Sequence, residues 1–219
     1  APRGKSWLTR NRILLNGEPR WLTLPIRRKG LQPIHEVEIN YDTNFKIKHL
    51  GTLKQAYHKA KFFKEVYPLL ESLYSQLPKT AKEFSLCSIK EICNSMGIKT
   101  EFFLSSDIVL KAPEISSLGA NELVLELCLH SGANFYISGT GCLDFIRPTT
   151  FSARGIEFKF QDFSSPVYEQ VHGQPFINQM SILDALFNLG FSGTLNLLTD
   201  PMLQTPSEYL AEVGAQNLG

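Results

Sequence analysis

The sequence has 219 residues, of which 43% are apolar and 20% charged. This length suits one domain or one domain with a small appendage, and the apolar content excludes wholesale disorder. No apolar run approaches the ~18 residues that a membrane span needs, and no signal peptide is expected. The four cysteines form no C-x-x-C pair. We therefore expect reduced thiols, no metal or cofactor, and a cytoplasmic location.

The charge is distributed unevenly along the sequence, because the net charge is only +1 but the N-terminal stretch is strongly basic. Residues 1–29 contain eight Lys and Arg side chains and one acid, Glu18, so they carry +7 and leave −6 for the other 190 residues. Trp7 and Trp21 lie among these cations. Such a stretch can hold a phosphate or an acidic partner, and the alternative is a solvated basic edge. No RNA-binding motif or amphipathic membrane helix is evident, so we expect no nucleic-acid partner.

The N-terminal part predicts a β-hairpin followed by helices. Asn16-Gly17 is the strongest short hairpin signal, and it lies between two predicted strands, Arg12–Leu15 and Arg20–Ile26. Residues Glu36–Ile39 alternate in polarity and predict a third strand. Residues Phe45–Tyr74 are typical of a basic helical region with a break before Pro68.

A helix–glycine–strand pattern then occurs three times. The first helix opens with the capping box Thr80–Glu83 and ends at Gly97, and equivalent glycines follow at Gly132 and Gly155. The strands predicted after these glycines are Lys99–Leu104, Asn134–Ile137 and Ile156–Phe160. This order is typical of βαβ units. It predicts an α/β fold with a Rossmann-like parallel sheet, flanking helices and a short N-terminal β-hairpin.

The remaining segments complete the predicted organisation. A loop is expected over Ile108–Gly119, and Ser181–Asp184 is expected to cap a helix that ends near Gly190. Pro206 is expected to begin a short helix. We expect a single α/β domain over residues 1–190 and a C-terminal tail over residues 191–219.

Polar residues follow all three predicted strands of the parallel sheet, where ligands usually bind. They are Ser105-Ser106-Asp107, Ser138-Gly139-Thr140-Gly141 and Gln161-Asp162. The glycine loop could bring backbone N–H groups to an anion, but it lacks the P-loop lysine and the full dinucleotide fingerprint. A plain tight turn is the alternative.

Three residues near these strand ends could do chemistry. Asp144 and Asp162 could take a proton from an amine or hold a sugar hydroxyl, and the alternative for Asp144 is a carboxylate in the first turn of a helix. Cys142 could be a nucleophile at a helix N-terminus, but no histidine has a recognisable spacing to it. A structural cysteine is therefore favoured, and Asp107 is interpreted as a plain loop residue.

In order along the chain, several stretches resemble the WbqC-like family of bacteria over roughly residues 5 to 190. They are Lys5–Ile13, Trp21–Pro25, Tyr57–Tyr67, Gly97–Ser106, Tyr136–Phe145, Gly155-Ile156, Tyr168 and Asn178–Phe187. The family normally begins with a short strand and a Gln-Pro motif that this sequence lacks, and we expect that segment to supply a strand and part of the site. Cys142 stands where the family usually has Gly, which weakens the nucleophile hypothesis.

The resemblance implies a transferase that forms an amide between an acyl or glycyl group and a nucleotide-linked amino sugar, in O-antigen or related polysaccharide biosynthesis. The implied partners are the nucleotide amino sugar and an acyl donor activated elsewhere. The basic stretch would hold the pyrophosphate, the strand-end loops would line the pocket, and Asp144 or Asp162 would orient or deprotonate the amine. The expected substrate-binding residues are Lys5, Trp7, Arg10, Asn11, Arg12, Ser105, Ser106, Ser138, Gly139, Thr140 and Gly141. A non-catalytic binding protein of the same pathway and a cysteine acyltransferase that uses Cys142 are the alternatives.

Overall fold

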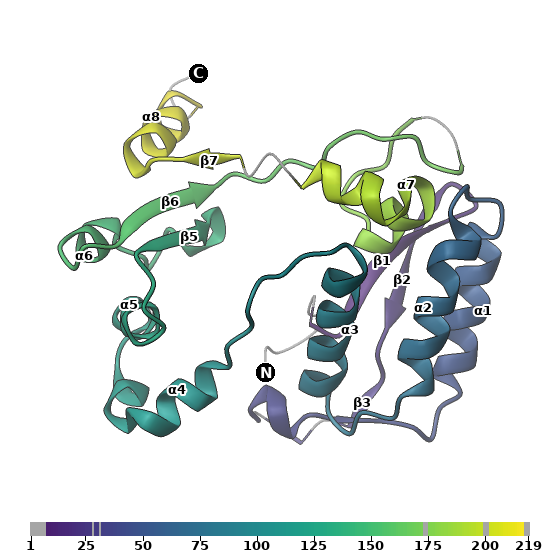
Figure 1. Ribbon diagram of the computed structural model, residues 1–219, viewed down its shortest axis with the longest axis horizontal. Helices are drawn as coiled ribbons and strands as arrows, with labels where there is room; N and C mark the ends of the chain where they lie inside the picture. The colour runs from purple at the N-terminus through teal and green to yellow at the C-terminus, as the bar shows by residue number, and fades with distance from the viewer. Residues whose placement is uncertain (1–7, 28, 31, 173–174, 199–201, 217–219) are drawn as a thin grey trace. The chain divides into compact units, whose positions relative to one another are not determined.

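The computed structural model describes residues 8–27, 29–30, 32–172, 175–198 and 202–216 (Figure 1). The chain forms two compact units, each assembled from segments that are distant in the sequence. Unit 1 comprises Ala1–Lys99 and Ser165–Thr199, and unit 2 comprises Thr100–Ser164 and Asp200–Gly219. The basic stretch therefore belongs to unit 1, and the glycine loop belongs to unit 2.

Unit 1 begins with the predicted hairpin. Strands β1 (Arg10–Leu15) and β2 (Glu18–Thr23) pair antiparallel, with Arg12 opposite Trp21. Asn16 and Gly17 have φ angles of 53° and 79°, the positive values that a two-residue hairpin turn of this type needs. A second short antiparallel pair joins β3 (Ile26–Arg27) to β4 (Glu38–Ile39), after a 3₁₀ turn at Ile34–Glu36.

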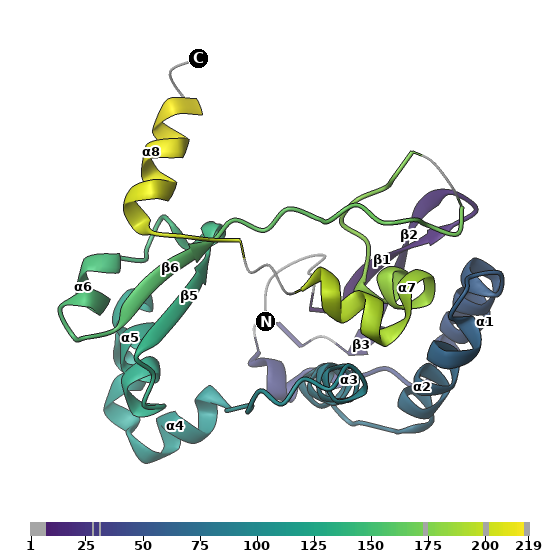
Figure 2. The same ribbon diagram turned by 45° about the horizontal axis from the view of Figure 1, so that its top comes forward.

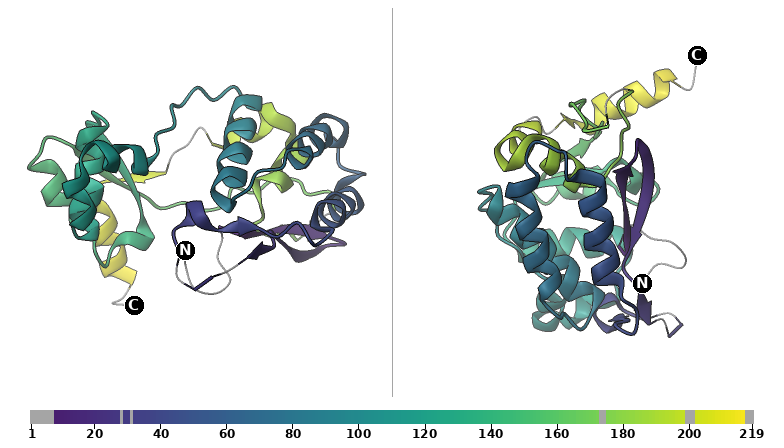
Figure 3. Two further views of the ribbon diagram at one scale, coloured as in Figure 1. Left: turned by 90° about the horizontal axis from the view of Figure 1, so that it is seen from below. Right: turned by 90° about the vertical axis from the view of Figure 1, so that its right-hand side faces the viewer.

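Four helices complete unit 1, and Figure 3 shows helices along one side of the hairpin. The four helices are α1 (Phe45–Tyr57), α2 (Phe63–Ser75), α3 (Ala81–Ser95) and α7 (Ile182–Leu197). The predicted break before Pro68 is wrong, because Pro68 lies inside α2. The break falls instead at residues 58–62, where the Phe62 backbone N–H donates to the carbonyl oxygen of Phe187 in α7 at 3.0 Å. A contact between distant segments therefore lies at the start of α2.

The predicted helix caps of unit 1 are confirmed. The Thr80 side chain accepts from the Glu83 backbone N–H, and the Glu83 carboxylate accepts from the Thr80 N–H in return. Gly97 has a φ angle of 76°, as expected of a glycine just after a helix. The Ser181 hydroxyl caps α7 by accepting from the Leu183 N–H.

The core of unit 1 joins the hairpin to its helices. Ile13 of β1 packs among residues of α1, α2 and α7, and Tyr57 stacks on Phe187 with 4.5 Å between ring centroids. A smaller apolar cluster around Phe45 joins the β3–β4 pair to α1 and α3. Ile13 and Leu14 point to opposite faces of β1 and both are buried, and charged side chains also lie on both faces, since Arg20 is opposite Ile13 and Arg12 is opposite Trp21.

Unit 2 is built around a small mixed sheet. Strands β5 (Phe135–Gly139) and β6 (Glu157–Gln161) run parallel, side by side, and β7 (Leu203–Gln204) pairs antiparallel with β6 (Figure 2). The helices are α4 (Ser105–Lys111), α5 (Ala120–His130), α6 (Pro148–Ser152) and α8 (Pro206–Gln216), with 3₁₀ turns at Pro113–Ser117 and Thr140–Cys142. Phe151, Phe158, Phe160 and Tyr209 are among the buried residues of its core.

The fold prediction is confirmed in part. The parallel pairing of the second and third predicted strands is confirmed, but a full Rossmann-like sheet is not present among the described residues. The predicted strand Lys99–Leu104 is wrong, because this stretch pairs with no strand and Phe103 is 65% exposed. An apolar run after a glycine resembles a strand in sequence, but a strand needs a neighbour that supplies hydrogen bonds.

Two further expectations for unit 2 are corrected. Ser105 and Ser106 do not end a strand but form the first turn of α4. The expected loop Ile108–Gly119 is mostly helical, since it contains the end of α4 and a 3₁₀ turn. In the expected tail, the helix predicted at Pro206 is present as α8, and Tyr209 packs 5.1 Å from Phe160 between ring centroids.

The kink of α7 at Gly190 gives a prediction about stability. Gly190 has φ 71° and ψ −179°, a conformation that only glycine adopts readily, and an added Cβ would lie 2.6 Å from the Phe62 ring. We expect Gly190→Ala to lower the free energy of unfolding by about 2–5 kcal/mol, from backbone strain and overpacking together.

The matched control is Gly51→Ala, on an exposed helical site of α1 where an added Cβ would meet nothing within 4 Å. This change should raise the free energy of unfolding by about 0.5–1 kcal/mol. Urea denaturation followed by circular dichroism measures both variants. Equal stabilities for the two variants would contradict this account of the kink.

Candidate functional site

A cavity lies within unit 1. Its volume is about 280 Å³, and its walls come from the hairpin, α1, α2, α3 and the first turn of α7. The apolar lining residues are Leu8, Ile13, Leu22, Leu24, Leu70, Leu73, Phe84, Ile89, Ile92, Ile182 and Leu183. The polar lining residues are Thr9, Arg10, Asn11, His49, Tyr74, Ser85, Ser88 and Ser181. A mostly apolar wall with a few polar groups is typical of a small-molecule site.

The polar groups of the cavity come mainly from helices. His49 Nδ1 lies 2.9 Å from the Tyr74 hydroxyl oxygen, and the two rings meet edge to face. Burial lowers the pKa of His49, and a hydrogen bond to the Thr23 backbone partly opposes this shift. Burial also raises the pKa of Tyr74. Both side chains are therefore uncharged at neutral pH, and the pair can offer hydrogen bonds without charge.

Arg10 and Asn11, two of the predicted substrate-binding residues, line this cavity. The guanidinium of Arg10 lies 3.9 Å from the centre of the Trp21 ring, and that of Arg12 lies 5.8 Å from it. Because side chains alternate along a strand, Arg10 and Arg12 share one face of β1, and Ile13 faces the helices from the other. Among the described residues neither arginine has an acidic partner, so both charges are available beside the cavity.

Arg12 also has a structural role that the sequence did not indicate. Its Nη2 donates to the Gln179 backbone oxygen at 3.0 Å and to Gln179 Oε1 at 3.1 Å. The Arg12 carbonyl in turn accepts from the Ser181 backbone N–H at 2.7 Å. These bonds fix the start of α7 against β1, which places Ser181 in the cavity wall.

A buried carboxylate in the first turn of α7 also fixes the start of this helix. Asp184 is fully buried and accepts hydrogen bonds from Tyr57 and Tyr168, both at 2.8 Å, and from Gln170 at 2.9 Å. The Tyr57 hydroxyl also accepts from the Leu14 backbone N–H at 2.9 Å. Burial and the neighbouring Asp184 charge raise the pKa of both tyrosines, so both hydroxyls remain protonated donors.

In unit 2 the predicted strand-end residues are exposed apart from Ser138, Thr140 and Gln161. Gly139 pairs with Gln161, so the glycine loop and Asp162 follow the same edge of the parallel pair. Ser138 is 1% exposed, and its hydroxyl donates to the Gly139 carbonyl at 3.2 Å. Thr140 and Gly141 form a 3₁₀ turn, as the predicted helical turn requires.

The two predicted catalytic acids of unit 2 are both on the surface. Asp144 is exposed and has no hydrogen bond or ion pair to any other described residue. Asp162 is exposed, and its backbone N–H donates to the Met202 carbonyl at 3.3 Å. Cys142 is half-buried and packs against the core of unit 2, as the structural interpretation expects.

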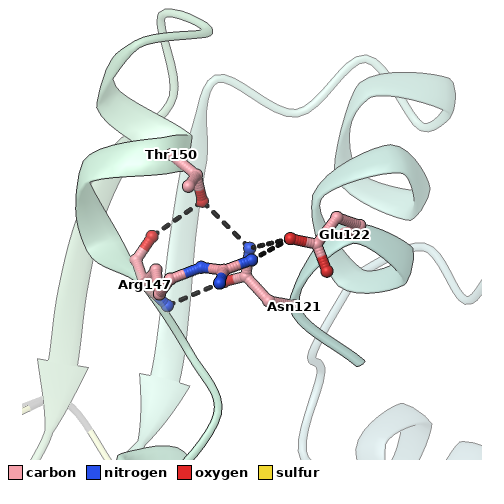
Figure 4. Close-up of polar contacts among 4 residues, drawn as sticks. All are labelled: Asn121, Glu122, Arg147 and Thr150. Atoms are coloured by element: carbon pink, nitrogen blue, oxygen red, sulfur yellow. Dashed lines mark hydrogen bonds and ion pairs between the residues drawn. The ribbon is translucent and has the colours of Figure 1, made fainter. Parts of the chain in front are cut away.

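The segment after Asp144 is held by a group of polar contacts between α5 and α6 (Figure 4). The buried Asn121 accepts from the Arg147 backbone N–H at 2.7 Å and donates to the Thr150 hydroxyl at 3.1 Å. Arg147 also forms an ion pair with Glu122. Hydrogen bonding to its own backbone, then to Asn121 and Arg147, lowers the pKa of Glu122. These contacts fix the end of the glycine-loop segment.

The predicted site residues thus fall on separate parts of the chain. Arg10, Asn11 and Arg12 belong to unit 1, and Ser105, Ser106, the glycine loop and both acids belong to unit 2. Lys5 and Trp7 lie outside the described residues. The sequence reasoning missed His49, Tyr74, Ser85 and Ser88. The helical spacing of Ser85, Ser88 and Ile92 was the signal that could have located one wall of the cavity.

The lowered pKa of His49 predicts a pH dependence of stability. The unfolded chain binds a proton near pH 6.5 whereas the folded chain resists it, so stability falls as the pH drops through and below about 6.5. We expect His49→Gln to remove part of this loss. Urea midpoints between pH 8 and pH 5 measure it, with His130→Gln, at an exposed site of α5, as the matched control. The same slope for wild type and His49→Gln would contradict the assignment.

Among the described residues, no helix has the length and apolar character to cross a membrane, and no group of three His, Cys, Asp or Glu side chains could hold a metal ion.

Comparisons with known proteins identify the family. The model of the WbqC-like protein family matches residues 3–195. The uncharacterized protein Rv1507c of Mycobacterium tuberculosis is 30% identical over 192 residues, which cover 85% of this chain and 79% of that protein. No solved structure matches the chain. The match of one family model over most of the sequence confirms the resemblance found in its motifs, and the chain belongs to the WbqC-like protein family.

Proposed function

We propose that the chain is a transferase that forms an amide between an acyl or glycyl group and a nucleotide-linked amino sugar, in bacterial surface polysaccharide or related biosynthesis. The observation that carries this proposal is membership of the WbqC-like family over residues 3–195. The cavity of unit 1 supports it, because a transferase needs an enclosed place for one of its substrates.

The chemistry of the proposal is a nucleophilic substitution at an activated carboxyl group. The sugar amine attacks the carbonyl carbon, a C–N bond forms, and the activating group leaves with its electron pair. The amine loses one proton, which Asp144 or Asp162 would take. In unit 1, Arg10 and Arg12 carry charges that no acidic side chain of the described residues neutralises, and such charges can bind a phosphate. The loop Ser138–Gly141 and the serines Ser105 and Ser106 would contact the sugar.

A second candidate is ligand binding without turnover. Asp144 is exposed and has no polar partner among the described residues, which favours this candidate, because a catalytic base is usually oriented by a neighbouring group. Incubation of the protein with a nucleotide amino sugar and acyl thioesters, followed by mass spectrometry, separates the two. An increase in mass by one acyl group supports the transferase, and binding of the sugar without any product supports the second candidate.

Asp144→Asn tests the proposed base directly. Asparagine keeps the shape and one acceptor but cannot take the proton, so we expect turnover to fall about 10²–10⁴-fold with little change in sugar binding. Asp107→Asn, at an exposed site in the first turn of α4, is the matched control and should keep the wild-type rate. Initial rates and calorimetric affinities measure both. An unchanged rate in Asp144→Asn would remove this residue from the site.

A further inference from the structure

The described lining of the cavity in unit 1 consists almost entirely of uncharged side chains. Among the described residues it includes no Asp, Glu or Lys, and Arg10 is their one charged member. The Arg10 guanidinium stacks on Trp21, which is 51% exposed, on the face of the hairpin opposite to Ile13. The space between the hairpin and α3 is therefore bordered by neutral side chains, most of them Leu and Ile.

The described lining disfavours a positively charged occupant. A glycyl group carries an ammonium ion at neutral pH, and burial of an unpaired ammonium is costly. The described lining offers it no carboxylate, whereas the Ser85 hydroxyl can donate to an uncharged carbonyl. The chemistry of the lining thus favours an apolar chain with one neutral polar end.

The volume of the cavity limits the length of that chain. The cavity volume of about 280 Å³ lies just below the ~300–1,000 Å³ range of pockets that hold drug-sized ligands, so the occupant is a smaller group. A straight acyl chain of about six to eight carbons would fill it, and a glycyl group would leave most of it empty. Apolar surface that is removed from water supplies the binding free energy.

We infer that this cavity binds an uncharged straight-chain acyl group of about six to eight carbons. The claim that the cavity binds this group stands on the cavity alone. The claim that this group is transferred to the amino sugar rests on the proposed function. The acyl donor is then a medium-chain one, and the glycyl group is not the natural substrate.

Calorimetry of the full chain with butanamide, hexanamide and octanamide tests the binding. The affinity should rise about fourfold for each added methylene until the cavity is full. Ser88→Phe should fill the cavity and weaken octanamide binding at least about tenfold. Ser95→Phe is the matched control, because both serines lie on α3 and donate to the carbonyl four residues earlier at 2.8 Å, but only Ser88 lines the cavity.

A second variant tests the same cavity in case Ser88→Phe does not fold. Ile89 lines the cavity but is 49% exposed, so Ile89→Glu places a charge at the rim without disturbing the core. It should also weaken octanamide binding. Affinities that do not depend on chain length, or equal affinities for Ser88→Phe and Ser95→Phe, would overturn the inference.

Transfer assays with octanoyl and glycyl thioesters separate this inference from the proposed function. If octanamide binds and Ser88→Phe blocks it, but neither acyl group is transferred, the cavity assignment holds and the transferase proposal fails. If the glycyl group is transferred and octanamide does not bind, the transferase proposal holds and the cavity assignment is overturned.

Discussion

The buried carboxylate of Asp184 is the interaction on which the rest of unit 1 depends. It lies in the first turn of α7 and accepts three hydrogen bonds from neutral donors on α1 and the segment before α7. Through the Tyr57 hydroxyl the same network reaches the Leu14 backbone of β1. An isolated buried charge would be costly, and these donors together with the helix N-terminus offset that cost.

The consequence for the cavity is direct. Ser181, Ile182 and Leu183, which immediately precede Asp184, form one of its walls. The hairpin forms the opposite side, and Arg12 joins the two through Gln179. The cavity therefore exists because a polar network outside it fixes two separate segments of the chain.

The sequence predicted the parts of the fold that depend on local chemistry. Asn16-Gly17, the Thr80 capping box and the glycines after helices all act within a few residues, and each is found where the pattern placed it. The strand Lys99–Leu104 and the break before Pro68 failed because they depend on distant partners. A hydrogen bond from Phe62 to Phe187, residues far apart in the sequence, has no local signal.

The candidate site was predictable to a lesser extent. Charge alone drew attention to Arg10 and Arg12, but it could not show that Arg12 also binds Gln179. The cavity is lined by residues from six elements, and His49 and Tyr74 meet only after α1 and α2 pack together. Asp184 was interpreted as a helix cap, although its side chain instead accepts from Tyr57, Tyr168 and Gln170.

The central claim is that a buried network outside the cavity gives the cavity its shape, and one variant tests it most directly. Tyr168→Phe removes one donor to Asp184 and changes no residue that lines the cavity. Calorimetry with octanamide, under conditions where the variant is fully folded, measures the coupling. The account predicts an affinity about 2–30-fold weaker than that of the wild type, the usual range for coupling between such sites. An unchanged affinity would contradict it.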